Sequence, residues 1–222
     1  MKITRSEFII ICIVFLSFII SAYFYPQMPD SIASHWNASG EADGYVSKFW
    51  GLFILPVISL GIAAVLLVLA RTGVLRSRIE GFRAYYYGFL IVFLGFFLYL
   101  HLLTVLWNLS YGLNIMQMLA PAIGVMMYIV GKMMSNVKMN RYFGIRTPWT
   151  LNNEEVWKKT HTMGGKLFKI AGIICLFGVL FPDYAFALMF YPIIAAALIA
   201  VIYSYLKYRR ITQDGQSEEI GG

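Results

Sequence analysis

Long apolar runs separated by polar segments dominate this sequence. We expect the apolar runs to form helices at residues 8–25, 49–70, 84–107, 113–134, 165–181 and 184–206. A helix needs roughly 20 apolar residues to cross a bilayer, and inside lipid it satisfies its own backbone hydrogen bonds. The pattern therefore predicts an all-α, polytopic membrane protein, with six transmembrane helices in a single integral membrane domain over residues 1–222.

The composition supports a membrane class. Hydrophobic residues make up 59% of the chain and charged residues 13%, whereas soluble domains have about 45–50% apolar and about 25% charged residues. The first apolar run follows Lys2 and Arg5, as in a signal peptide, but it is longer than a signal-peptide core and ends in Tyr23, Phe24 and Tyr25. Such aromatic residues favour the membrane interface. We expect this run to be retained as the first helix.

The distribution of Lys and Arg predicts the orientation. With the N-terminus inside, every Lys and Arg except Lys48 falls in an inner segment, as the positive-inside rule requires. We therefore expect both termini in the cytoplasm (N-in/C-in), an outer loop at 26–48 and an inner loop at 135–164, in a multi-pass protein of the cell membrane. The net charge of +7 then reflects topology and contact with the lipid bilayer, so no direct nucleic-acid binding is expected.

The two halves of the chain follow the same plan. Each reads as a helix, a long polar loop, a helix, a short connection and a third helix. An odd number of helices per half would invert the second half, so a 3+3 inverted pseudo-repeat is a hypothesis, although the two halves share negligible sequence similarity.

A transporter is the alternative function at this stage. Pro56, Pro121 and Pro192 lie inside predicted helices and would permit kinks around a cavity. His101 is the main ionisable side chain within a predicted span, and its expected partners are the nearby polar residues Asn108, Asn114 and Gln117. A small membrane transporter or permease with a proline-kinked helix cavity would use these features.

The outer loop contains a compact set of polar side chains. His35, Trp36, Asn37, Glu41 and Asp43 lie close together in the sequence, and we nominate them as ligand-sensing residues. A histidine with two carboxylates also leaves a divalent metal open as an alternative. Their spacing matches no strong metal motif, so we expect an ordered, tryptophan-anchored loop with no metal and no cofactor.

The inner loop divides into two parts. Residues 140–149 are rich in Arg and aromatic residues and are stiffened by Pro148. Asn152 then resembles a helix N-cap with Glu155 in the first turn, which predicts a short interfacial helix before a hinge at Gly164-Gly165. Glu155 and His161 do not have the i, i+4 spacing of a metalloprotease helix, and we find no nucleophile elbow or phosphate loop. We therefore predict that the protein is not an enzyme.

Two segments resemble a known family. Phe143-Gly-Ile-Arg-Thr-Pro-Trp-Thr-Leu151, followed by Glu155-Val-Trp157, resembles the hallmark of the SdpI family of bacterial membrane proteins. The outer loop resembles the domain of unknown function that opens many members of that family. The outer resemblance rests on Tyr25-Pro26, Pro29, His35-Trp36-Asn37, Gly40 and Ser47-Lys48.

The resemblance implies a function in immunity and signalling. The founding member protects its producer from a secreted killing peptide, and it draws a cytoplasmic repressor to the membrane when the toxin is present. For this chain the resemblance implies a peptide toxin as an outer partner and a repressor protein as an inner partner. The nominated partner-binding residues match the inner motif: Arg146, Thr147, Pro148, Trp149, Glu155 and Trp157.

Overall fold

Six long helices form the body of the protein. The computed structural model describes residues 3–72, 83–141 and 143–220, and all six helices there are long and apolar enough to cross a membrane. They are α1 (Arg5–Phe24), α2 (Lys48–Arg71), α4 (Arg83–Asn108), α5 (Ile115–Met134), α7 (Glu154–Leu176) and α8 (Ala185–Ile220). The predicted six-helix membrane fold is confirmed, and α8 continues well beyond its predicted end at residue 206.

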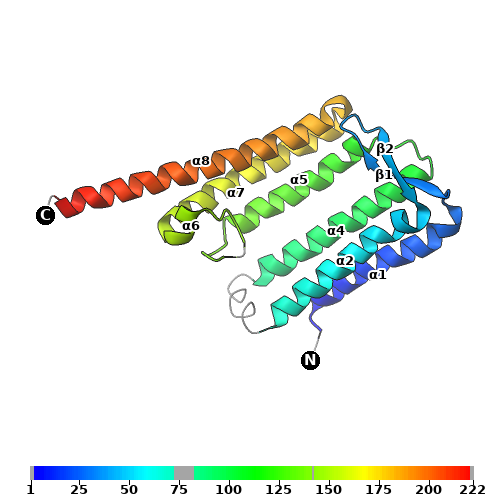
Figure 1. Cartoon of the computed structure of the whole chain (residues 1–222), viewed down its shortest axis with the longest axis horizontal. Helices are drawn as coiled ribbons and strands as arrows, with labels where there is room; N and C mark the ends of the chain where they lie inside the picture. The colour runs from blue at the N-terminus through cyan, green and yellow to red at the C-terminus, as the bar shows by residue number, and fades with distance from the viewer. Residues whose placement is uncertain (1–2, 73–82, 142, 221–222) are drawn as a thin grey trace.

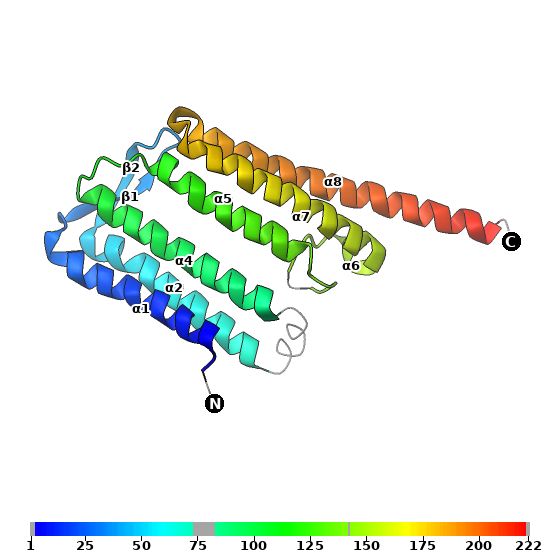
Figure 2. The same ribbon diagram turned by 180° about the vertical axis from the view of Figure 1, so that it is seen from behind.

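The helices form two groups of three. Helices α1, α2 and α4 pack together, as do α5, α7 and α8, and the two groups meet where α4 contacts α5 (Figures 1 and 2). Short 3₁₀ turns join several helices: η1 (Tyr25–Gln27), η3 (Phe177–Val179) and η4 (Pro182–Tyr184). The start of α1 and the end of α8 lie on the side of the bundle that also carries the short helix α6 (Pro148–Asn152), and α8 projects beyond it (Figure 1).

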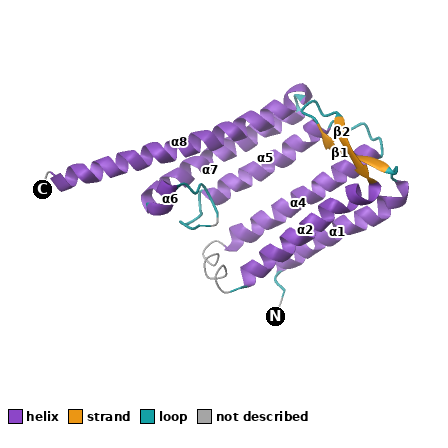
Figure 3. Ribbon diagram, viewed as in Figure 1, coloured by secondary structure: helices purple, strands orange, loops and turns teal. Residues whose placement is uncertain are grey.

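The opposite end carries a β-hairpin, which the sequence reasoning did not predict (Figure 3). Strands β1 (Ser31–Trp36) and β2 (Ala42–Ser47) pair antiparallel, with Ser31 opposite Ser47. A tight turn joins the strands, and Gly40 adopts a positive φ of 83° there, which glycine tolerates without a Cβ clash. The expected outer loop is therefore ordered as a small sheet.

The predicted interfacial helix and hinge in the inner loop are wrong. Helix α7 begins at Glu154 and runs unbroken to Leu176, so Gly164-Gly165 lies inside a continuous helix. Its N-cap is Asn153, whose side chain accepts a hydrogen bond from the Val156 backbone N–H, and not Asn152. The separate short helix is α6, which precedes this cap.

Glycines allow α5 and α7 to approach until their backbones touch. A Cβ added to Gly124 would lie 2.7 Å from the Gly172 carbonyl oxygen, and one added to Gly131 would lie 2.6 Å from the Gly165 carbonyl oxygen. Small residues at these positions are typical of closely packed membrane helices. The glycine pair at 164–165 thus serves close packing and does not create a hinge.

Polar side chains tie the first three helices together. The Glu7 carboxylate is buried and accepts two hydrogen bonds from the Arg71 guanidinium, at 2.9 and 2.8 Å, and one from the Tyr87 hydroxyl. Further along the bundle, buried His101 is 3.0 Å from the Ser21 hydroxyl, which donates to the Leu52 carbonyl. The expected contacts of His101 with Asn108, Asn114 or Gln117 are wrong, because its partner comes from α1.

Candidate functional site at the two ends of the bundle

A buried aromatic pair anchors the inner loop to α7. Trp157 and His161 stack with ring centroids 3.8 Å apart, and each is 2% exposed. The Trp157 indole N–H donates to the Val137 carbonyl at 2.9 Å. His161 Nδ1 donates to the Trp157 carbonyl at 2.8 Å, and His161 Nε2 accepts from the Ile145 backbone N–H at 3.0 Å. Both rings therefore fix the path of the loop with all their polar atoms bonded.

Gly144 is the tightest point of this anchor. It adopts a φ of 109°, and a Cβ added to it would lie 2.2 Å from His161 Nε2. The neighbouring Phe143 packs edge-on against Tyr86 of α4, with ring centroids 6.0 Å apart. The loop thus contacts both helix groups within two residues.

Helix α6 is capped and fastened to α8. Thr147 is its N-cap, and the buried Thr150 hydroxyl accepts from the Thr147 backbone N–H at 2.9 Å and donates to the Ile145 carbonyl at 2.8 Å. The Trp149 indole N–H donates to the Ser204 hydroxyl at 2.6 Å, and its ring lies edge-on to Tyr205. Pro148 occupies the first position of the helix, where its missing N–H costs nothing.

The nominated inner residues thus divide by exposure. Trp157 is in the core, and Thr147 and Trp149 serve α6, whereas Arg146, Pro148 and Glu155 are exposed. Arg146 donates to the Arg141 carbonyl at 3.0 Å, and Glu155 pairs with Lys159 one turn along α7. The nominated residues available to a partner at this end are therefore two charged side chains and Pro148.

Asn108 of α4 holds the outer hairpin against the bundle, a role that the sequence did not indicate. The Asn108 side chain accepts from the Ala33 backbone N–H at 2.8 Å and donates to the Ala33 carbonyl at 3.0 Å. It thereby pairs with the edge of β1 as a neighbouring strand would. Trp36 adds an edge-on contact with Trp107 of α4, with ring centroids 5.6 Å apart, so the expectation of a tryptophan-anchored outer loop agrees with the structure.

The polar residues nominated in the outer loop form two separate pairs. His35 Nδ1 lies 2.5 Å from Asp43 Oδ1, across the strands, and both side chains are largely exposed. Asn37 donates to Glu41 at 3.1 Å and organises the turn by accepting from the backbone N–H groups of Ser39 and Glu41. In the part of the chain that the structure describes, no group of three His, Cys, Asp or Glu residues is arranged to hold a metal ion.

The features that suggested a transporter lie apart from one another. Pro121 lines a groove between α4 and α5, Pro192 lines a different pocket on α8, and Pro56 is buried. His101 is fully buried among helices α1, α2 and α4. Among the residues that the structure describes, the three prolines and His101 therefore do not line one common cavity.

Sequence reasoning missed Gly144, Thr150, His161, Ser204 and Asn108 as residues that build these two ends. Gly144 lies within the recognised inner motif, and His161 follows Trp157 at the i, i+4 spacing of one helix face. These two signals were present in the sequence. The partners Ser204 and Asn108 are distant in sequence from the residues they hold, and no local pattern indicates them.

Comparison with known proteins agrees with both resemblances. Residues 12–60 match a domain of unknown function, DUF1648, and residues 136–206 match the SdpI/YfhL protein family. The chain is 28% identical over 208 residues to Immunity protein SdpI of Bacillus subtilis (strain 168), covering 93% of this chain and 98% of that protein. No solved structure shows a significant match. The resemblance to the SdpI family is therefore confirmed, and the six long apolar helices agree with a multi-pass membrane protein.

Proposed function

We propose that this protein protects the membrane of the cell that produces it from a secreted antimicrobial peptide. The observation that carries the proposal is the similarity to an immunity protein along 93% of the chain, which includes both ordered ends of the bundle. The hairpin would meet the peptide on the outer side, where it presents His35, Asp43 and Glu41 as exposed side chains.

Survival of a sensitive bacterium tests this function. The host would express the full chain and be exposed to the killing peptide that the founding SdpI member counteracts, with membrane insertion checked by fractionation. We expect a rise in the lethal concentration of the peptide. Asp43→Asn should reduce protection, whereas Asp183→Asn, at an exposed carboxylate in the η4 turn between α7 and α8, should not. Equal killing with and without the inserted protein would overturn the proposal.

The proposal extends to the inner end, where a cytoplasmic repressor would dock. Arg146 and Glu155 are the exposed charged groups of the inner motif, and the buried Trp157–His161 pair would hold the loop that carries Arg146. This surface would act only as a docking site, since its geometry suggests no reaction.

Co-purification tests the docking role. The probe is the repressor that the founding member recruits, mixed with membranes containing the full chain and the killing peptide. Arg146→Ala should abolish retention of the repressor, while Lys138→Ala, an exposed basic residue of the same loop outside the motif, should leave it unchanged. Retention by Arg146→Ala at the wild-type level would refute the role of this surface.

A further inference from the structure

A pocket of about 370 Å³ lies beneath the hairpin, where the two helix groups meet. Its walls come from α2, α4, α5 and β1 and are mostly aliphatic, as Leu55, Leu103 and Leu119 illustrate. Trp36 and Ser34 of β1 and Thr104 of α4 are its polar lining residues. Pockets of this size and composition are typical of small apolar ligands that are oriented by a few polar groups.

Trp36, which lines this pocket, carries an unused hydrogen-bond donor. Its indole N–H is buried and has no hydrogen-bond partner among the residues that the structure describes. The Thr104 hydroxyl, by contrast, already donates to the Leu100 carbonyl at 3.0 Å. Because buried donors in proteins are nearly always bonded, the free indole N–H indicates a place for an acceptor from a ligand.

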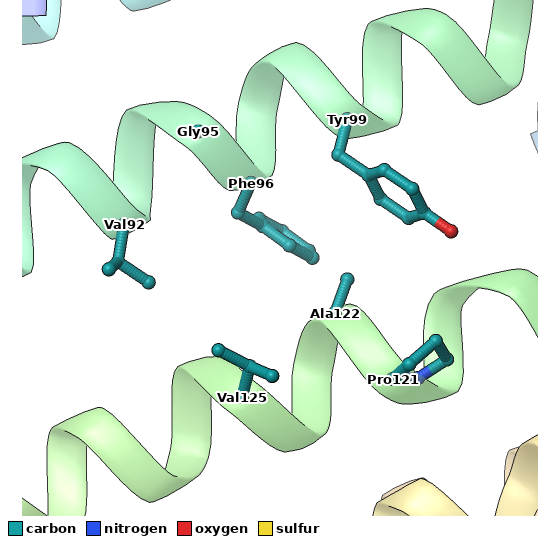
Figure 4. A pocket seen from close by; sticks show the side chains of 7 residues that line it. All are labelled: Val92, Gly95, Phe96, Tyr99, Pro121, Ala122 and Val125. Carbon is teal, nitrogen blue, oxygen red and sulfur yellow. The ribbon is translucent and has the colours of Figure 1, made fainter. Parts of the chain in front are cut away.

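A second groove of similar size shows what the hairpin pocket has in addition. The groove between α4 and α5 has a volume of about 350 Å³ and is lined by Val92, Phe96, Val125 and similar side chains (Figure 4). Its one side-chain hydroxyl belongs to Tyr99 and already donates to the Met118 carbonyl at 2.8 Å. That groove offers apolar walls suited to lipid chains, whereas the hairpin pocket also offers a donor.

The pocket is accessible from the lipid side. Ile54 and Ile58 both line it, yet they are 45% and 41% exposed, so it opens along the outer surface of α2. A ligand that is already dissolved in the membrane could therefore enter it from the side, beneath the hairpin.

The charge around this end of the bundle favours a cationic ligand. Asp30, Glu41 and Asp43 are exposed there, and Lys48 is tied to Asp30 at 3.0 Å. An acidic rim attracts cationic peptides and repels the headgroups of anionic phospholipids. A peptide with a basic and an apolar part fits both the rim and the pocket.

We infer that the hairpin pocket binds an apolar residue of a cationic, membrane-inserted peptide. The Trp36 indole N–H donates to a backbone carbonyl of that peptide, and the aliphatic walls enclose the side chain. This inference rests on the proposed immunity function, since it assigns the contact through which the killing peptide is held.

Filling the pocket tests the inference. Ile58→Trp places a bulky indole ring in the pocket from its lipid-facing side. The control is Val57→Trp, which places the same ring at the neighbouring position; Val57 is 53% exposed and does not line the pocket. The full-length protein in nanodiscs would be titrated with a fluorescent copy of the killing peptide that the founding member counteracts. We expect Ile58→Trp to weaken binding at least tenfold and Val57→Trp to stay within twofold of wild type.

A second pair of variants tests the donor with a smaller change in side-chain volume. Trp36→Phe removes the N–H and keeps an aromatic ring, and Trp50→Phe does the same at an exposed tryptophan of α2. The loss of one hydrogen bond should weaken binding by about 3- to 10-fold in Trp36→Phe, with no change in Trp50→Phe.

The outcomes separate this inference from the immunity proposal. A wild-type protein that neither protects nor binds the peptide overturns both. A wild-type protein that protects, together with Ile58→Trp and Trp36→Phe variants that bind and protect equally well, overturns the pocket alone. Native mass spectrometry adds one more outcome. A phospholipid that is retained by wild type and Val57→Trp but lost from Ile58→Trp, at unchanged peptide affinity, would assign the pocket to lipid and overturn the inference.

Discussion

The two ends of the bundle use their polar side chains in opposite ways. At the inner end, the Trp157 N–H and both ring nitrogens of His161 are bonded within the protein. At the outer end, His35 and Asp43 form an exposed pair and the Trp36 N–H is buried without a partner among the described residues. The inner motif therefore mainly fixes a loop, while the hairpin carries an exposed His35–Asp43 pair and one unbonded indole N–H.

This difference changes how the inner motif should be interpreted. A conspicuous motif suggests direct contacts with a partner, yet Trp157 and Thr150 are almost fully buried. They stabilise the loop that presents Arg146. Mutations in the motif would then act on folding first and on recognition second. The following predictions compare the effects on stability of residues at the two ends of the bundle.

The largest effect is expected at Gly144. In Gly144→Ala the new Cβ would clash with His161 and the backbone would be held at a φ of 109°, which alone costs on the order of 1–3 kcal/mol. Gly112→Ala is the control, because Gly112 also has a positive φ, of 65°, but has open space around it. Thermal unfolding in detergent should show a much larger loss of stability for Gly144→Ala. Equal losses of thermal stability in the two variants would show that the clash with His161 adds nothing to the effect of the positive φ.

The next effect is expected from Trp157→Phe. The substitution keeps a stacked ring on His161 but leaves the Val137 carbonyl without its donor, which costs about 1–3 kcal/mol for a buried group. Chemical unfolding in mixed micelles would measure the loss. Trp50→Phe, at a tryptophan that is 59% exposed, should be close to neutral, and a similar loss in both variants would contradict the anchoring role.

A smaller and more local effect is expected from Asn108→Ala. The buried Ala33 backbone would lose both of its bonds to the Asn108 side chain, so the hairpin should open more often. Amide hydrogen exchange should accelerate across residues 31–47 and stay unchanged in α5 and α7. Unchanged exchange in the hairpin would show that packing of Ile32 and Trp36 alone holds it in place.

The smallest effect on stability is expected from Glu155→Gln. Glu155 and Lys159 form an exposed pair within one helix, and such pairs contribute little to folding. Glu7→Gln removes the buried partner of Arg71 and should lower the thermal midpoint clearly. If Glu155→Gln lowered the midpoint as much as Glu7→Gln, the inner surface would be structural as well and would no longer be a simple docking face.

Hydropathy was sufficient to predict the six helices, because each must bury about 20 apolar residues in lipid. It did not predict the start of α7, since the first turns of that helix are charged and Gly164-Gly165 reads as a break on helix propensity alone. The close packing of Gly165 against Gly131 overrides that propensity. The hairpin was missed because β1 is a short strand of only six residues between proline and glycine turns.

The polar contacts of the candidate site were harder to predict. Gly144 and Trp157 lie within the inner motif, and their importance follows from it. Their atomic partners depend on how the elements pack, as the bonds of Trp149 to Ser204 and of His101 to Ser21 show. These pairs are separated by 55 and 80 residues, so no local pattern in the chain indicates them.

The glycine contacts between α5 and α7 have a mechanical consequence. Gly124 meets Gly172 and Gly131 meets Gly165 with backbone against backbone, about two turns apart along α5. Helices that touch at two such points cannot slide past each other without losing both contacts. We therefore expect α5 and α7 to move together as one rigid unit. A displacement at the η3 end of α7, where Gly178 packs against Ala120, should then be transmitted along this pair of helices to His161 and the loop carrying Arg146.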